Sequence, residues 1–274
     1  MTETNKTQYK LLVLDLDGTL TNKKKEITQT TKEALRKAQE KGIKIVLASG
    51  RPTYGIVPLA EEISLAQYEG YILSYNGGNI IDWATKRLIH EKELSLDTIP
   101  QLYDMAQSHG VDILSYIGED IVTENTANEY VQHEAMLNKM PLRQVESFTE
   151  VVNQPVAKCL IVGDGEKLIP LEAKMKARFG EIMNIYRSEP FFLELMPQNI
   201  DKANSLQILL DHLGMCKEEM IACGDGYNDL SMIQFAGLGV AMANAQPEVK
   251  EAANYITLSN EEDGVAHVIN EFIL

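Results

Sequence analysis

Runs of aliphatic residues that end in polar residues recur along the chain and predict buried strands. The first run lies within residues 10–14, and further runs lie at 43–48, 71–78, 219–226 and 238–242. Between the first two runs, apolar residues recur at helical spacing and stop before Gly42, where the C-terminal cap of a helix belongs. Strands that alternate with helices in this way predict a parallel sheet with right-handed crossovers.

The pattern changes after about residue 78. Residues 79–83 and 87–90 flank a polar turn and predict a hairpin, and helical patterns then alternate with short strands up to about residue 188. FFLELM at 191–196 predicts a strand with which the strand–helix alternation of the core resumes. A helix with leucines along one face follows it and ends at Gly214. We therefore predict a Rossmann-like α/β core of residues 1–83 and 189–274, with an α+β module of residues 84–188 inserted.

Composition and charge narrow the possible partners. The chain has 25 Lys and Arg against 40 Asp and Glu, a net charge of −15, and this charge repels a nucleic-acid backbone. Its three cysteines lie far apart, which argues against a disulfide framework or a zinc site. The first ten residues are polar, and no run approaches the roughly 20 apolar residues of a membrane span. We expect a cytoplasmic protein that binds neither nucleic acid nor membrane.

Four polar clusters are predicted to follow strands of the core. They are DLDGT at 15–19, ASGR at 48–51, GDGYND at 224–229, and Lys202 at the start of the helix after FFLELM. Ligands of an open parallel sheet bind at the carboxyl ends of its strands, so we expect the four clusters to converge on one edge.

The convergence of several carboxylates requires a cation. Asp15 and Asp17 would be joined at this edge by Asp225 and Asp229. Two carboxylates about 4 Å apart repel each other by roughly 4 kcal/mol at an effective dielectric constant of 20. Oxygen ligands without a nearby histidine or cysteine favour Mg²⁺. A single D-x-D or G-D-G is often only a turn, and it is the joint pattern that indicates a site.

These motifs resemble those of the haloacid dehalogenase superfamily of phosphatases. DLDGTL (15–20) resembles its first motif, ASGR the second, Lys202 the third-motif lysine and GDGYND the fourth motif. The insert between the second and third motifs resembles the C2 cap of the Cof-type subfamily. The segment NGG (76–78) also matches the N-G-small turn of that subfamily. Ala203 stands where that subfamily usually has glycine, and residues 199–201 are Asn-Ile-Asp in place of Gly-Val-Ser. We expect Lys202 to keep its role.

The resemblance implies hydrolysis of small phosphate monoesters through an aspartyl-phosphate. In this reading Asp15 is the nucleophile and Asp17 is the general acid and base. The residues implied in binding the substrate phosphate are Ser49, Gly50, Lys202 and Asn228. Those implied in binding Mg²⁺ are Asp15, the backbone carbonyl of Asp17 and Asp225, with Asp229 binding it directly or supporting the other ligands.

Several alternatives stay open at this stage. Sugar phosphates are the favoured substrates, with pyridoxal phosphate, flavin mononucleotide or a sugar phosphomutase reaction as rivals. A receiver-like phospho-acceptor would also use an aspartate, Mg²⁺, Ser/Thr and Lys, but it lacks an acid in the position of Asp17. Arg51 could reach the substrate or the cap, and the run KKKE at 23–26 is expected to form a solvated flap.

Overall fold

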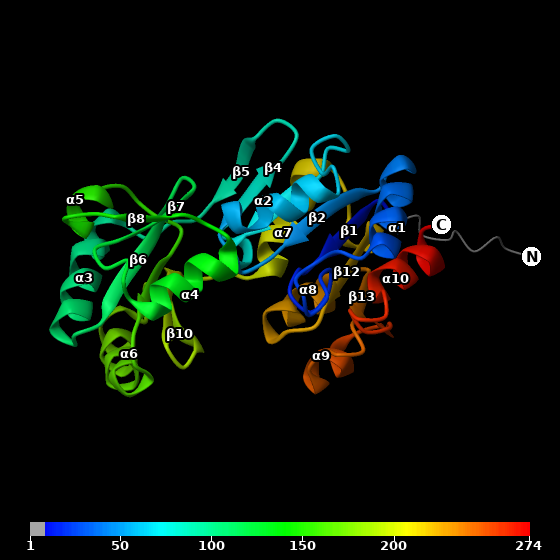
Figure 1. Cartoon of the computed structure of the whole chain (residues 1–274). Coiled ribbons are helices and arrows are strands. Elements are labelled where there is room, and N and C mark those ends of the chain that lie inside the picture. The colour runs from blue at the N-terminus through cyan, green and yellow to red at the C-terminus, as the bar shows by residue number, and fades with distance from the viewer. Residues whose placement is uncertain (1–8) are drawn as a thin grey trace, which may run out of the picture. The chain divides into compact units, whose positions relative to one another are not determined.

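A computed structural model of the chain describes residues 9–274, which form two compact units (Figure 1). The main unit comprises residues 9–90 together with Asp201–Leu274, and the inserted unit is Glu91–Ile200. Each unit has its own sheet. The predicted fold class, a parallel α/β core with an inserted α+β module, is confirmed.

The sheet of the main unit has eight strands in the order β14-β13-β12-β1-β2-β3-β4-β5. The six strands from β14 to β3 run parallel to one another, and β4 pairs antiparallel with β3. The strands are β1 (Leu11–Leu14), β2 (Lys44–Ala48), β3 (Tyr71–Ser74), β4 (Asn79–Asp82), β5 (Arg87–Glu91), β12 (Met220–Gly224), β13 (Leu238–Ala241) and β14 (Tyr255–Ile256). Every residue of β1 and β12 is buried, as expected for central parallel strands.

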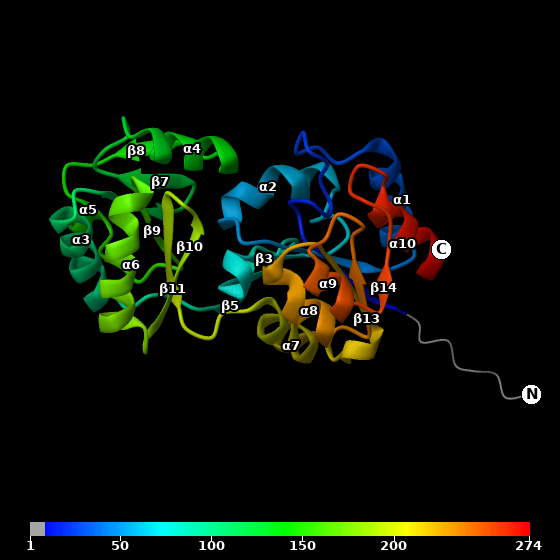
Figure 2. The ribbon, with the colours of Figure 1, turned by 90° about the horizontal axis from the view of Figure 1, so that it is seen from below.

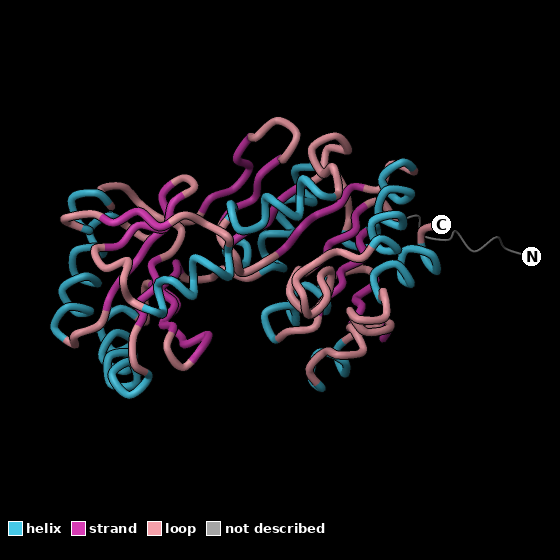
Figure 3. Tube along the Cα trace, viewed as in Figure 1, coloured by secondary structure: helices cyan, strands magenta, loops and turns pink. Residues whose placement is uncertain are grey.

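Helices flank this sheet (Figure 3). They are α1 (Gln29–Glu40), α2 (Thr53–Glu62), α7 (Lys202–Leu213), α8 (Leu230–Phe235), α9 (Pro247–Ala252) and α10 (Gly264–Phe272). α1 packs against α10, and Figure 2 shows the two side by side. The Asp201 side chain caps α7 by accepting the Asn204 backbone N–H at 3.0 Å, and Gly214 ends this helix at a φ of 65°.

The inserted unit contains a six-stranded sheet in the order β10-β11-β9-β6-β7-β8. Its strands are β6 (Asp112–Ile117), β7 (Asp120–Thr123), β8 (Leu142–Gln144), β9 (Cys159–Val162), β10 (Met183–Glu189) and β11 (Phe192–Pro197). Its helices are α3 (Ile99–Ser108), α4 (Glu129–Asn138), α5 (Phe148–Val151) and α6 (Gly165–Phe179). One face of the sheet packs on α3 and α6 around an apolar core that includes Leu102, Ile161 and Leu168.

The placement of FFLELM in the main sheet was wrong. This segment does form a strand, β11, but β11 pairs antiparallel with β10 and β9 of the inserted sheet. A short apolar run predicts burial and cannot specify which sheet buries it. Lys202 therefore follows the return of the chain from the inserted unit. The predicted limits of the insert, 84 and 188, lie before those of the compact unit, 91 and 200, because the β4–β5 hairpin extends the main sheet and β11 completes the inserted one.

We expect Leu12→Ala to lower the free energy of unfolding of the main unit by about 3 kcal/mol, through lost apolar burial and a cavity. Leu12 is 0% exposed in the central strand β1. Leu88→Ala is the control, since Leu88 lies in β5 of the same sheet and is 41% exposed. Urea unfolding followed by fluorescence of the single tryptophan, Trp83, reports on this unit. Equal losses for the two variants would contradict the assignment of β1 as the centre of the core.

Candidate active site

Three parallel strands of the main unit bring the predicted residues to one edge of the sheet. β1 lies between β12 and β2, and the three strands run in the same direction. Asp15 directly follows β1, Ser49 follows β2, and Asp225 follows β12. The carboxyl ends of neighbouring parallel strands coincide, so these side chains meet where such sheets bind ligands. The predicted convergence therefore holds for these three clusters.

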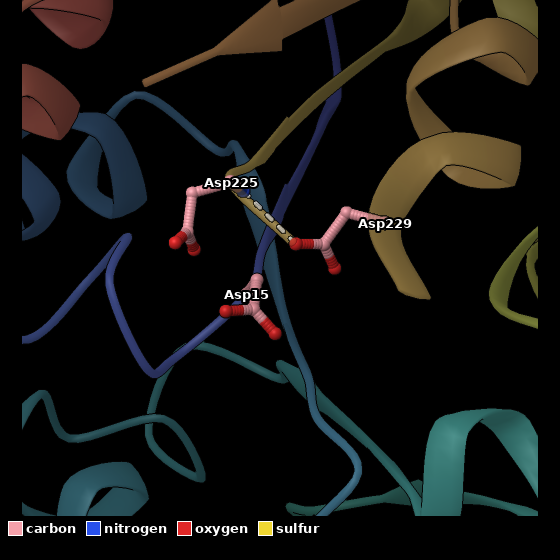
Figure 4. Close-up of side chains that lie close together, drawn as sticks. All are labelled: Asp15, Asp225 and Asp229. Atoms are coloured by element: carbon pink, nitrogen blue, oxygen red, sulfur yellow. Dashed lines mark hydrogen bonds between the residues drawn. The ribbon is translucent and has the colours of Figure 1, made fainter. Parts of the chain in front are cut away.

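Asp15, Asp225 and Asp229 form a carboxylate cluster (Figure 4). One oxygen from each lies within 4.8 Å of the others, and this is the only group of potential metal ligands found among residues 9–274. Asp229 is fully buried, and its Oδ2 accepts the backbone N–H groups of Asp225 and Gly226, both at 2.9 Å. The Thr19 hydroxyl donates to Asp225 Oδ1 at 3.0 Å.

Glycine at position 18 permits the close approach of the first and fourth motifs. Gly18 has a φ of 90°, and a Cβ there would stand 2.3 Å from Asp225 Oδ2. Any side chain at this position would be strained and would displace the carboxylate. The Asn244 side chain holds the same turn by donating to the Gly18 carbonyl at 2.8 Å. Sequence reasoning missed Asn244, because no pattern links it to the motifs.

Lys202 lies fully buried at the start of α7. Its Nζ donates to Asp15 Oδ1 at 2.7 Å, to Asp229 Oδ1 at 2.6 Å and to the Ala48 carbonyl at 2.9 Å. An ammonium group has three hydrogens, so every donor of Lys202 is satisfied. Burial alone would lower the pKa of Lys202, but the charges of Asp15 and Asp229 outweigh burial and raise it.

One ammonium does not balance three carboxylates. Burial and the charge of Asp229 raise the pKa of Asp15 well above its usual range, although Lys202 opposes the shift. Burial is also the main reason that the pKa of Asp225 is raised to about 6. Raised carboxyl pKa values mean that the cluster holds more negative charge than its surroundings stabilise. A divalent cation with a preference for oxygen ligands fits both the charge and the donor set.

Asp17 lies in the opposite electrostatic environment. Arg51 donates to both of its oxygens, from Nε at 2.8 Å and from Nη2 at 2.7 Å, and the Lys25 ammonium is 2.6 Å from Oδ1. Burial would raise the pKa of Asp17, but the hydrogen bonds and charges of Arg51 and Lys25 outweigh burial and lower it. Arg51, left open between substrate and cap, thus contacts Asp17. Lys25 belongs to the predicted solvated flap, and its contact was not foreseen.

The remaining predicted residues, Ser49, Gly50 and Asn228, belong to the second and fourth motifs. Ser49 is buried, and its Oγ accepts the Arg51 backbone N–H at 3.2 Å. The Asn228 amide donates from Nδ2 to Asn76 Oδ1 at 3.1 Å, and Asn76 also lies against Gly50. The sequence indicated only a turn at Asn76, so its place beside Gly50 and Asn228 is a finding of the structure.

Comparisons with known proteins agree with this geometry. A family model described as haloacid dehalogenase-like hydrolase matches residues 12–269. The Bacillus subtilis protein YxeH is 35% identical over 269 residues, which cover 97% of this chain and 99% of that protein. The Bacillus subtilis 5-amino-6-(5-phospho-D-ribitylamino)uracil phosphatase YcsE is 32% identical over 265 residues, covering 97% of this chain and 96% of that protein.

Solved structures extend the similarity to both units. A haloacid dehalogenase-like hydrolase from Bacteroides thetaiotaomicron has a TM-score of 0.94 and is 58% identical, covering 96% of this chain and 99% of that one. The sugar phosphatase BT4131, of HAD subclass IIB, has a TM-score of 0.78 and is 26% identical, covering 96% of this chain and 98% of that one.

The chain belongs to the haloacid dehalogenase-like hydrolase family. Within it, the chain is a Cof-type phosphatase of subclass IIB, and it acts on phosphate monoesters of small compounds. Phosphatases of this family use a divalent metal, and Asp15, Asp225 and Asp229 could hold one. The family resemblance drawn from the motifs is confirmed. In the described part of the chain, the helices are too short or too polar to cross a bilayer.

The carboxylate cluster predicts an unusual dependence of stability on pH. In EDTA the folded protein holds the protons of Asp15 and Asp225 more tightly than the unfolded chain does, because both pKa values are raised. Stability therefore falls as the pH rises from about 4 through the raised values, near 6 for Asp225. In EDTA at pH 8 we expect Asp225→Asn to raise the melting temperature by about 2–4 °C relative to wild type, with little difference at pH 4.5.

Mg²⁺ supplies the control for this prediction. Added Mg²⁺ should raise the melting temperature of the wild type at pH 8, because it binds only the folded cluster, and should raise that of Asp225→Asn much less. Scanning fluorimetry at several pH values measures both effects. An Asn variant that is less stable than wild type in EDTA at pH 8 would show that Asp225 is not destabilised by its neighbours.

Proposed function

We propose that the protein catalyses Mg²⁺-dependent hydrolysis of phosphate monoesters of small polyhydroxylated compounds, sugar phosphates foremost, through a phosphorylated Asp15. The observation that carries the proposal is the placement of Asp15. Its carboxylate lies at the end of the central strand β1, beside Lys202 and two further carboxylates, at the edge where parallel sheets bind ligands. A carboxylate held this rigidly can act as a nucleophile.

The proposed reaction has two steps. A carboxylate oxygen of Asp15 forms a bond to phosphorus while the bond to the leaving oxygen breaks, and Asp17 gives that oxygen a proton. A water molecule then attacks the phosphorus of the aspartyl-phosphate and gives a proton back to Asp17. The second step releases inorganic phosphate and restores Asp15 as a carboxylate.

Other residues hold the phosphate and the cation. Ser49, the Gly50 amide and Asn228 would bind the phosphate oxygens, and Lys202 would do so by exchanging one of its three present acceptors for a phosphate oxygen. Asp15, the backbone carbonyl of Asp17 and Asp225 would hold Mg²⁺, which when bound offsets the carboxylate repulsion and stabilises charge on the transferring phosphoryl group. Asp229 accepts from Lys202 and from two backbone N–H groups, so it would orient Lys202 and the loop of Asp225 whether or not it also binds the ion.

Asp17 favours a hydrolase over a receiver-like phospho-acceptor. A receiver domain keeps its phosphoryl group because nothing beside the phosphorylated aspartate activates water. Here a second carboxylate follows two residues later and is held in place by Arg51 and Lys25. A carboxylate that is deprotonated in the second step can act as the general base.

We propose a polyhydroxylated leaving group because of the activities of two similar proteins. BT4131 is a sugar phosphatase, and YcsE is a phosphatase for a 5-phospho-D-ribitylamino compound. Sugars and ribityl chains both present several hydroxyl groups. A ribityl phosphate is therefore the second candidate substrate, on the strength of the 32% identity to YcsE.

The inserted unit contains buried polar residues suited to hydroxyl groups. On the sheet face opposite α3 and α6, Lys158 and Glu194 form an ion pair at 2.6 Å, and the Tyr116 hydroxyl donates to Glu134. The Ser188 hydroxyl donates to Glu194 Oε1 at 2.7 Å. A hydroxyl group both donates and accepts, so a mixed set of this kind matches a polyhydroxylated group better than an apolar one.

Phosphatase activity is the first test. We expect p-nitrophenyl phosphate and a panel of sugar and ribityl phosphates to be hydrolysed with Mg²⁺ and not with EDTA. Asp15→Asn should lower kcat by at least about 10³-fold, because the amide cannot form the acyl phosphate. Asp211→Asn, at the end of α7, is the control. Full activity in Asp15→Asn would remove Asp15 from the mechanism, and a panel in which no polyhydroxylated ester is hydrolysed would remove the proposed substrate class.

The contact of Lys25 with Asp17 predicts a change in the pH profile. Asp17 must carry a proton when the leaving group departs, and Lys25 helps to keep its pKa low. Lys25→Met should therefore move the alkaline limb of kcat for a sugar phosphate to higher pH. p-Nitrophenolate leaves without a proton, so its profile should move much less.

Lys24→Met is the matched control for Lys25→Met. Lys24 neighbours Lys25 in the same flap and is also exposed, and it makes no side-chain hydrogen bond or ion pair within residues 9–274. Lys24→Met removes one positive charge from the flap, as Lys25→Met does, but it breaks no contact with Asp17. Equal shifts in the two variants would indicate a general field effect and would contradict a specific role for the Lys25 contact.

A further inference from the structure

The turn after β3 has an unusual backbone. Tyr75, Asn76 and Gly77 have φ values of 53°, 54° and 106°, so three successive residues lie in the left-handed half of conformational space. Residues other than glycine adopt this conformation at an energetic cost, and asparagine tolerates it better than most. Such strain persists only where the surroundings hold it in place, and it is common at ligand sites.

Contacts with two neighbouring segments hold this turn. The Asn76 backbone N–H donates to the Ser49 carbonyl at 2.9 Å, and the Tyr75 N–H donates to the Arg51 carbonyl at 3.0 Å. On the other side, the Ser205 hydroxyl of α7 donates to the Gly77 carbonyl at 2.7 Å. The turn is therefore bound both to the loop that carries Ser49 and Gly50 and to the helix that begins with Lys202.

The side chain of Asn76 lies between two residues of the proposed phosphate site. Its Oδ1 accepts the Nδ2–H of Asn228 at 3.1 Å. Its Nδ2 lies 3.0 Å from the point where a Cβ on Gly50 would stand, so the carboxamide lies over the backbone of Gly50. The second and fourth motifs are thereby bridged by one side chain that belongs to neither motif.

We propose that Asn76 is a positioning residue for the substrate phosphate, which orients Asn228 and confines the Gly50 loop so that their N–H groups converge on the phosphate oxygens. This inference rests on the roles proposed above for Gly50 and Asn228. Glycine would meet the backbone requirement with less strain, so the presence of asparagine is explained by its carboxamide. Aspartate could still accept from Asn228, but its charge would repel the phosphate.

The test separates the side chain from the backbone. Asn76→Gly permits the same left-handed turn and removes the side chain that carries the carboxamide. We expect its melting temperature to equal or exceed that of the wild type. We expect KM for p-nitrophenyl phosphate and the inhibition constant of inorganic phosphate to rise together by about tenfold, with a smaller change in kcat, because ground-state phosphate binding is lost. Asn76→Asp should raise both constants further.

A control for the relief of strain is available in the same unit. Ser64 also has a left-handed φ, 55°, and its side chain is exposed and makes no hydrogen bond within residues 9–274. Ser64→Gly should raise the melting temperature without altering either constant. Wild-type constants in Asn76→Gly would overturn the inference, and so would a lower melting temperature with fewer active molecules and unchanged KM. If the wild type itself hydrolyses no monoester, the proposed function fails and the inference with it.

Discussion

The buried ammonium of Lys202 is the interaction on which the rest of the site depends. It joins the end of β1 through Asp15, the end of β2 through the Ala48 carbonyl, and the loop after β12 through Asp229. A lysine with no exposed surface is stable as a cation only if its partners compensate for the loss of water, and three short hydrogen bonds provide that compensation. Because Lys202 is the first residue of α7, the same bonds also set where this helix begins against the sheet.

Two aspartates only two residues apart have opposite environments. Asp15 lies among carboxylates and is buried, so its pKa is raised, whereas Asp17 lies between Arg51 and Lys25, so its pKa is lowered. A nucleophile must be ionised, and a general acid must be protonated. The surroundings of Asp15 favour its protonated form and those of Asp17 its ionised form, so each environment opposes the role proposed for that group in the first step. A cation held at Asp15 would favour the ionised form of this group, and loss of a contact from Lys25 would favour the protonated form of Asp17.

The proposed function assigns recognition of the phosphate to the main unit and leaves the choice of leaving group to the inserted unit. In the main unit the donors, the carboxylates and Lys202 are suited to any phosphate ester, and they do not distinguish one alcohol from another. The inserted unit has its own apolar core and a sheet face with buried polar groups. Relatives named for different substrates match this chain over 96–97% of its length, so a shared fold accommodates different leaving groups.

The sequence by itself determined the fold class and the family, because apolar runs followed by polar residues are local patterns. It also determined the convergence of Asp15, Ser49 and Asp225, because neighbouring parallel strands end at the same edge of a sheet. Only the tertiary structure decided that β11 belongs to the inserted sheet, because a buried run carries no information about which strands it pairs with. It also decided that Arg51 and Lys25 hold Asp17 and that Asn76 reaches Asn228. These contacts join residues that are distant in the chain or separated by a turn, and their geometry depends on backbone conformations that no periodicity records.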